Sequence, residues 1–120
     1  LLAQMSSRGN LLDQKYTKET IETGRGSPHV IGYIGNGSSP EEIEQLREIV
    51  GPGQMIWTPG INLNTEAGKM GQRYGTPRES IVSGADIIIV GSGIHGQEDR
   101  ISAAKAYAEA SWNAILERGK

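Results

Sequence analysis

Two apolar segments that stop at glycine are the parts of the chain best suited to binding an anion. They are residues 55–60, with the sequence MIWTPG, and residues 86–91, with the sequence DIIIVG. Such runs are typical of parallel strands that are buried on both faces. Glycine at the carboxyl end of a strand lets main-chain N–H groups approach an anion closely. In β/α barrels the loops after the last two strands commonly hold a phosphate, so the pair predicts a phosphate site.

Candidate binding residues follow these two runs and a third apolar run at the amino terminus. The candidates for binding are Ser6, Pro59, Gln72, Arg73, Tyr74, Gly91 and Ser92. Hydroxyl, amide and main-chain donors suit a dianionic phosphate in a concave site. Structural roles remain open at this point. Ser6 could be a turn residue, and Gly91 with Ser92 could form a plain turn between a strand and a helix.

The elements that must position these residues alternate between strands and helices. Strands are expected at residues 1–5, 30–35, 55–60 and 85–90, and helices at 16–24, 39–50, 76–82 and 101–118. Two of the helices begin with the same Ser/Thr-Pro-x-Glu pattern, at Ser39 and Thr76, which is typical of a helix start. Alternation of this kind implies a parallel sheet with right-handed crossovers. Four β/α units could form an open doubly wound sheet or half of an eight-unit barrel.

Two further expectations concern packing and the longest loop. The last helix is expected to bury one face, formed by Ile101, Ala104, Ala108, Trp112 and Ile115, and Trp57 and Trp112 are both expected in the core. The segment between residues 61 and 75 is unusually long for a connection in a compact α/β chain. Its Gly, Asn, Thr and Lys content suits a mobile lid.

Composition narrows the class of protein. The chain has 120 residues, enough for one small domain but short of the roughly 250 of a complete β/α barrel. The net charge of −2 gives no electrostatic case for nucleic acid or an anionic membrane as partner. No cysteine is present, which excludes disulfides and a cysteine nucleophile and fits a cytoplasmic location. Neither His29 nor His95 has a partner at metal-ligand spacing, so we expect no metal site.

Four motifs in this order resemble the orotidine 5′-phosphate decarboxylase family, in the form found in fungi and in animal UMP synthase. They are Met5-Ser6-Ser7-x-Gly9, Thr58-Pro59-Gly60, Gly71-Gln72-x-Tyr74 and the strand from Asp86 to Gly91. The resemblance extends to the end of the chain, through Lys105, Tyr107, Trp112 and Ala114. What these motifs match is the second half of the family's (β/α)8 TIM barrel, strands five to eight, so residues 1–120 are expected to be one half-barrel.

The resemblance implies a role for each candidate residue. Ser6 would contact the amide edge of the pyrimidine, and Gln72 would bridge the base and phosphate ends of the substrate. The Tyr74 hydroxyl and the main-chain N–H groups at Gly91 and Ser92 would bind the phosphate. Pro59 would start a closing loop. The implied reaction converts orotidine 5′-phosphate to UMP and CO2 without metal or organic cofactor, in a protein that is usually a homodimer.

Two departures from the family pattern limit what this chain does alone. The family's catalytic lysines and aspartates lie on strands two and three, which are absent here, so no catalytic residue is assigned to this chain. Asp13-Gln14-Lys15 resembles the start of that array but lies after the first strand. Ser92 stands where the family has a phosphate-binding arginine, and we expect weaker phosphate binding unless Arg73 supplies the charge. Gln4 replaces the usual glutamate before the Met-Ser-Ser motif.

Three functions are compatible with these observations. The first is the substrate-binding half of a decarboxylase that works with the missing amino-terminal half. The second is a non-catalytic half-barrel that binds phosphates, and the third is another sugar-phosphate-binding TIM barrel. Turnover of orotidine 5′-phosphate, binding of UMP without turnover, and a preference for a sugar phosphate over UMP distinguish them.

Overall fold

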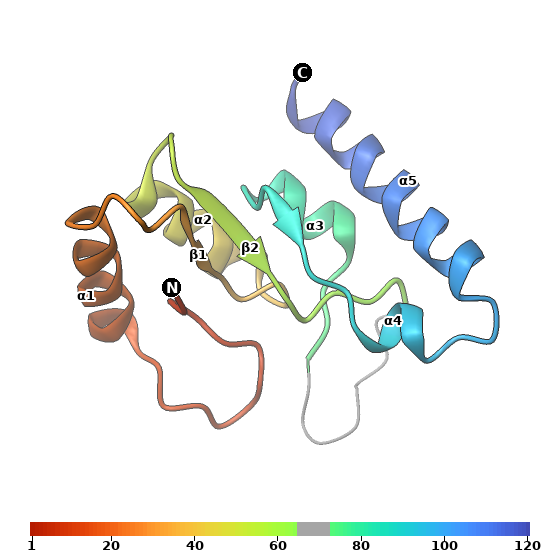
Figure 1. Ribbon diagram of the computed structural model, residues 1–120, viewed down its shortest axis with the longest axis horizontal. Coiled ribbons are helices and arrows are strands. Elements are labelled where there is room, and N and C mark those ends of the chain that lie inside the picture. Colours follow the sequence, from red (N-terminus) through yellow and green to blue (C-terminus); the bar gives the residue numbers. More distant parts are fainter. Residues whose placement is uncertain (65–72) are drawn as a thin grey trace.

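The computed structural model of the chain describes residues 1–64 and 73–120. Helices and strands alternate through most of this part (Figure 1). In chain order they are α1 (Gln14–Arg25), β1 (Gly32–Ile34), α2 (Pro40–Val50), β2 (Met55–Thr58), α3 (Pro77–Val82), β3 (Ile87–Ile88), α4 (Ser92–His95) and α5 (Arg100–Arg118).

The strands form a parallel sheet in the order β1-β2-β3, as the sequence predicts for β/α units. Gly32 pairs with Met55, and Trp57 pairs with Ile87, so neighbouring strands run in the same direction. All three strands are shorter than expected. Beyond both ends of β3, one further hydrogen bond on each side joins it to β2. The Asp86 N–H donates to the Ile56 carbonyl, and the Ile89 N–H donates to the Thr58 carbonyl. The parallel α/β class is therefore confirmed.

The expected first strand, residues 1–5, is present only as an isolated bridge between Leu2 and Ile34. The N–H groups of Ala3 and Gln4 both donate to the same Ile34 carbonyl at 3.0 Å. A regular parallel ladder needs alternate residues to donate to different carbonyls, so this doubled contact interrupts it. The segment nevertheless lies beside β1 and extends the sheet in the expected order.

Side chains cap the four longer helices, two of them, α2 and α3, at the positions that the sequence pattern indicates. Ser39 accepts a hydrogen bond from the Glu42 N–H at the start of α2, and Thr76 forms a complete capping box with Glu79 at the start of α3. Asp13 and Asp99 cap α1 and α5. The hydrogen bond from the Ser102 N–H lowers the pKa of the Asp99 carboxyl. Each cap satisfies main-chain donors that the first helical turn leaves free.

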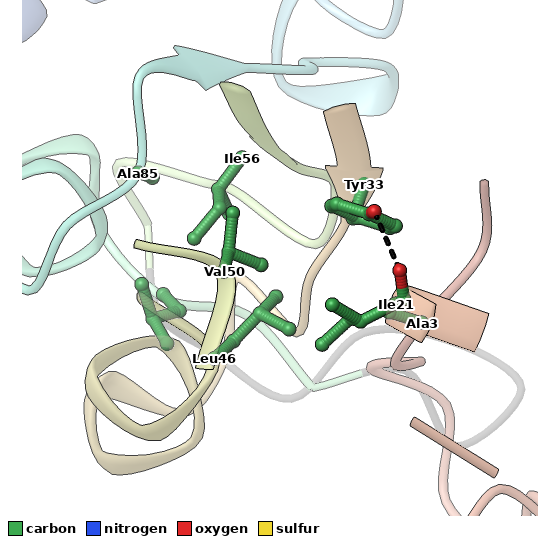
Figure 2. Packing of buried hydrophobic residues seen from close by; sticks show 8 residues of the cluster. Ala3, Ile21, Tyr33, Leu46, Val50, Ile56 and Ala85 are labelled. Atoms are coloured by element: carbon green, nitrogen blue, oxygen red, sulfur yellow. Dashed lines mark hydrogen bonds between the residues drawn. The ribbon is translucent and has the colours of Figure 1, made fainter. Parts of the chain in front are cut away.

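The main core lies between the sheet and helices α1 and α2. Ile21, Tyr33, Leu46 and Ile56 are fully buried there, and Figure 2 shows their side chains converging. The Tyr33 hydroxyl donates to the Ile21 carbonyl at 3.0 Å, so this large ring is buried without leaving its polar atom unpaired.

The last helix differs from expectation in the face that it buries. Tyr107 and Ala114 are its buried residues, and α5 packs on α3 and α4. By contrast Ile101 is 71% exposed and Trp112 is 61% exposed, so the prediction that Trp112 lies in the core is wrong. The residues of the expected face are exposed, and nothing in the described part of the chain covers them.

Candidate binding site at the strand ends

The candidate residues come together where the parallel strands end. Pro59 directly follows β2, and Gly91 lies between β3 and α4. Residues 73–75 join them because Gly75 pairs with Ile61 in an isolated bridge, with the Gly75 N–H donating to the Gly60 carbonyl at 2.9 Å. The bridge therefore closes the base of the long loop. Figure 1 shows these strand ends leading into the region of α4.

Tyr74 and Ser92 form a pair of neighbouring hydroxyl groups. The Tyr74 Oη and Ser92 Oγ atoms lie 3.4 Å apart, although 18 positions separate the residues in the chain. Ser92 is exposed, and it is the first residue of α4 after Gly91. The short helix α4 was not predicted, because four residues are too few to show a helical period. Two hydroxyls at the end of a parallel strand can both donate to one anion.

Ser6 lies on the other side of Gly60. Its side chain is buried, and Gly60 has a φ of 77°, a conformation that favours glycine. A Cβ atom at Gly60 would stand 2.8 Å from the Ser6 Cβ and Oγ atoms. Residue 60 is therefore restricted to glycine by two factors: its left-handed backbone conformation and the close approach of Ser6. The same turn orients Pro59 and the start of the long loop.

Arg73 contacts the segment of Ser6. Its Nε donates to the Ser6 main-chain carbonyl at 3.3 Å. It also lines a polar cavity of about 290 Å³, bounded by Gln4 and Met5, by the loop before α1, and by helices α1 and α2. Its guanidinium thus connects the end of the long loop to the first strand end. That Arg73 supplies positive charge to a bound phosphate remains a prediction.

The remaining sequence predictions for the site concern Gln72 and the Asp13 segment. Gln72 lies outside the described residues. Asp13 is the N-cap of α1, with its Oδ1 accepting from the Tyr16 N–H at 2.8 Å, and Lys15 pairs with Glu19 on the surface of that helix. These contacts give the Asp13-Gln14-Lys15 segment a structural role at a helix start.

Sequence reasoning missed a group of polar residues behind the strand ends. Asn36 is fully buried and bonded to Gln4 and Glu42. An asparagine following the apolar strand and preceding Gly37 was the available signal.

In residues 1–64 and 73–120, no three acidic or histidine side chains gather as they would around a metal ion. No helix there is long and apolar enough to cross a membrane.

The architecture is that of a parallel α/β protein whose donor groups line the carboxyl ends of its strands, which is where such folds place ligands. The comparison with family models agrees and is more specific. The model of the orotidine 5′-phosphate decarboxylase / HUMPS family matches residues 1–107. The chain belongs to this family.

Curated relatives carry the same family name. The chain is 42% identical to an orotidine 5′-phosphate decarboxylase of Phycomyces blakesleeanus and 41% identical to one of Mucor circinelloides f. lusitanicus. In both cases the match covers 98% of this chain and 43% of the relative. The chain therefore spans less than half the length of these relatives.

Solved structures give the same result for the fold. The chain is similar to orotidine 5′-phosphate decarboxylase from Pyrococcus horikoshii OT3, with a TM-score of 0.73 and 29% identity over 92% of this chain and 49% of that one. The Sulfolobus solfataricus enzyme also gives a TM-score of 0.73, at 22% identity, over 96% and 49% of the two chains. At 22% identity the second comparison supports the fold alone.

Proposed function

We propose that this chain is the phosphate- and base-binding half of an orotidine 5′-phosphate decarboxylase. The observation that carries the proposal is the convergence of the Ser6, Tyr74 and Ser92 segments where the strands of a parallel sheet end, in a chain that spans less than half the length of the relatives it matches. In this proposal residues 1–120 supply four consecutive β/α units, strands five to eight of a TIM barrel. The complete barrel converts orotidine 5′-phosphate to UMP and CO2.

The hydroxyls of Tyr74 and Ser92 have the placement needed to bind the phosphate. Their oxygen atoms, 3.4 Å apart, can donate to two oxygens of one phosphoryl group, with the main-chain N–H groups at Gly91 and Ser92 as further donors. Ser6 and Gln72 would bind the base end of the same nucleotide. Binding energy from the remote phosphate can drive closure of the loop after Pro59 and so favour the transition state.

The proton-transfer and charged groups of the reaction must come from another segment. The lysine and aspartate array implied by the resemblance has no counterpart in this chain, so activity requires an amino-terminal half. The exposed edge at Leu1 and Leu2 and the exposed Ile89 after β3 offer surfaces on which such a half could complete the sheet. A homodimer in the cytoplasm, acting without cofactor, completes the proposal.

The test combines this chain with the amino-terminal half of the Phycomyces blakesleeanus relative, coexpressed or joined as one polypeptide. We expect the purified complex to convert orotidine 5′-phosphate to UMP, followed by ultraviolet absorbance. Tyr74→Phe should raise KM for orotidine 5′-phosphate, because the phosphate loses one hydroxyl donor. Tyr16→Phe, on α1, is the matched control and should leave KM unchanged. A folded complex without turnover would contradict the proposal.

The replacement of the family arginine by Ser92 is the observation that keeps a second function open. A non-catalytic half-barrel would bind UMP but show no turnover in the combined barrel. Preference for a sugar phosphate over UMP would instead indicate another phosphate-binding barrel. Titration calorimetry with both ligands on the same preparation distinguishes these outcomes.

A further inference from the structure

A network of polar side chains lies behind the candidate site, with the fully buried Asn36 at its centre and the half-buried Gln4 and Glu42 beside it. We call Gln4, Asn36 and Glu42 the polar latch. The Asn36 Nδ2 donates to the Glu42 Oε2 at 2.9 Å, and the Asn36 N–H donates to the Gln4 Oε1 at 3.0 Å. The Gln4 Nε2 in turn donates to the Glu42 main-chain carbonyl at 3.0 Å. The latch therefore joins the first strand end, the end of β1 and the first turn of α2.

The role of Glu42 becomes clear from a comparison of two helices with the same starting pattern. In α3 the Glu79 carboxylate accepts from the N–H of its own cap residue, Thr76, at 3.0 Å. In α2 the corresponding N–H, that of Ser39, donates to the Asn36 carbonyl at 3.2 Å. The Glu42 carboxylate is thereby available to accept from the Asn36 side chain. The same local motif caps a helix in one place and anchors a loop in the other.

Asn36 also sets the conformation of the loop that follows β1. Its Oδ1 accepts from the Ser38 N–H at 3.0 Å and from the Ser38 hydroxyl at 2.6 Å, an arrangement that stabilises a turn. Asn36 has 0% exposure, and both polar atoms of its side chain are hydrogen-bonded, so its position is firmly held. The position of the intervening residue, Gly37, is consequently fixed by Asn36 on one side and Ser38 on the other.

Gly37 is the point where the latch reaches the candidate site. A Cβ atom on Gly75 would overlap the Gly37 carbonyl oxygen, and a Cβ atom on Gly37 would overlap the Pro59 carbonyl oxygen. The main chains at Gly37, Pro59 and Gly75 are therefore in direct contact. Gly75 follows Tyr74, whose hydroxyl lies beside Ser92. The series of contacts runs without a break from Asn36 to the pair of hydroxyls.

We propose that Asn36 is a positioning residue that, through the polar latch, holds Pro59 and Tyr74 where they bind the substrate. This inference rests on the proposed function for its catalytic consequence. It also accounts for Gln4. A glutamate at residue 4 would have no donor for the Glu42 carbonyl and would place a carboxylate oxygen against it. The amide of Gln4 is therefore required by the partner that it has in this chain.

The test uses variants that change one atom or one charge in the latch. Asn36→Asp replaces the donor to Glu42 with an acceptor and sets two carboxylates together. Adding Glu42→Gln restores a donor–acceptor pair of similar size, so the double variant Asn36→Asp/Glu42→Gln is the rescue. Gln4→Glu is a milder single variant that keeps the test usable if Asn36→Asp fails to fold. Asn113→Asp, at an exposed position on α5, is the matched control.

The structural readout is amide hydrogen exchange in the chain combined with the amino-terminal half. We expect Asn36→Asp and Gln4→Glu to accelerate exchange of the Ser38 and Gly75 amides by about tenfold or more, as loss of a hydrogen bond at the buried Asn36 or its partner Gln4 implies. The Ile56 amide, in the core strand β2, should be unaffected, and the double variant should restore the slow rates. Equal acceleration at all three amides would mean a general loss of stability and would overturn the proposal.

The functional readout is steady-state kinetics on the same preparations. We expect Asn36→Asp to raise KM for orotidine 5′-phosphate about tenfold or more, with a smaller change in kcat and recovery in the double variant. If exchange were accelerated only at Ser38 and Gly75 but KM were unchanged in an active barrel, the positioning role would be overturned. If the unmodified barrel lacked turnover and exchange were still accelerated only at Ser38 and Gly75, the latch would be supported and the proposed decarboxylase function contradicted.

Discussion

Ser92 has the largest influence on how tightly the proposed phosphate site can bind. Its hydroxyl can accept or donate one hydrogen bond beside Tyr74, but it carries no charge. An arginine at the same place would offer a fork of donors and a full positive charge to a phosphate. Arg73, the arginine expected to supply charge in its place, donates through Nε to the Ser6 main-chain carbonyl. We therefore expect the charge of this site to be low.

Ser92→Arg should increase the affinity for UMP about tenfold to hundredfold, because a charge-assisted hydrogen bond replaces a neutral one. The affinity for uridine, which has no phosphate, should not change. Ser83→Arg is the control, since it adds the same charge at the end of α3, before β3 begins. Titration calorimetry of the combined barrel measures both ligands. An equal gain for UMP and uridine would contradict a contact with the phosphate.

At residue 75 only glycine fits without a clash. Its φ is not in the left-handed region, so the requirement for glycine comes from the Gly37 carbonyl against which it packs. Gly75→Ala should lower the free energy of unfolding by about 1–3 kcal/mol, the usual effect of overpacking. Gly26→Ala, where a Cβ would stand 3.6 Å from the nearest atom, is the control. Thermal unfolding compares them, and equal midpoints would contradict the contact.

At the opposite ends of the strands, three helices are tied to the sheet by one charged cluster. Arg47 of α2 donates to the carbonyls of Gly51, Gln54 and Gly84 and pairs with the Asp86 carboxylate. Arg118 of α5 reaches Asp86 from the other side and also donates to the Ala85 and Ile81 carbonyls, the latter in α3. Asp86 in turn accepts from the Ile56 N–H of β2 at 2.9 Å. The cluster therefore orders the elements at the end of the sheet remote from the site.

Asp86→Asn should destabilise the protein by about 1.5–3 kcal/mol, because the Arg47 guanidinium and the Ile56 N–H lose a charged hydrogen-bond acceptor and Arg118 loses its ion-pair partner. Glu117→Gln is the contrast. It removes the same charge from the exposed pair with Arg78, and exposed pairs contribute little. Chemical denaturation of both variants provides the measurement. A similar loss in the two variants would show that Asp86 acts only as a surface charge.

For the molecule as a whole, the distribution of exposed apolar residues is the most informative property. Large apolar side chains are exposed at the Leu1–Leu2 edge, at Ile89 beyond β3 and along α5. Leu116, 51% exposed, extends the patch on α5 that Ile101 and Trp112 begin. Clusters of this kind mark surfaces that another segment covers. An amino-terminal half that closes the barrel would cover both edges of the sheet.

Addition of the amino-terminal half should therefore bury Trp112. In a Trp57→Phe background Trp112 is the sole tryptophan of this chain. With any tryptophan of the amino-terminal half replaced by Phe, the Trp112 fluorescence should shift to shorter wavelength and become less accessible to acrylamide. Trp112→Glu should weaken association of the two halves, whereas Asn113→Glu, the next residue, should not. Unchanged fluorescence in a complex shown to be active would mean that the apolar face of α5 serves a different partner.

The sequence by itself determined the class of fold, the alternation of strands with the longer helices, and the starts of α2 and α3, because each depends on local signals. Apolar runs that end in glycine define parallel strands, and Ser39 and Thr76 cap helices through bonds within one turn. The resemblance carried by short motifs also identified the family that residues 1–107 match. Local periodicity was less successful for α5, since it detects an apolar face but not what covers that face.

Only the tertiary structure decided which of these residues meet. The Tyr74 and Ser92 hydroxyls, the Arg73 contact with Ser6, and the polar latch all join residues that are far apart in the chain. The two Glu-containing helix starts are indistinguishable in pattern, yet Glu79 bonds its own cap and Glu42 bonds Asn36. The physical reason is that a side chain's hydrogen-bond partner depends on which acceptors and donors the fold places within about 3 Å, and that distance is set by packing rather than by neighbours in sequence.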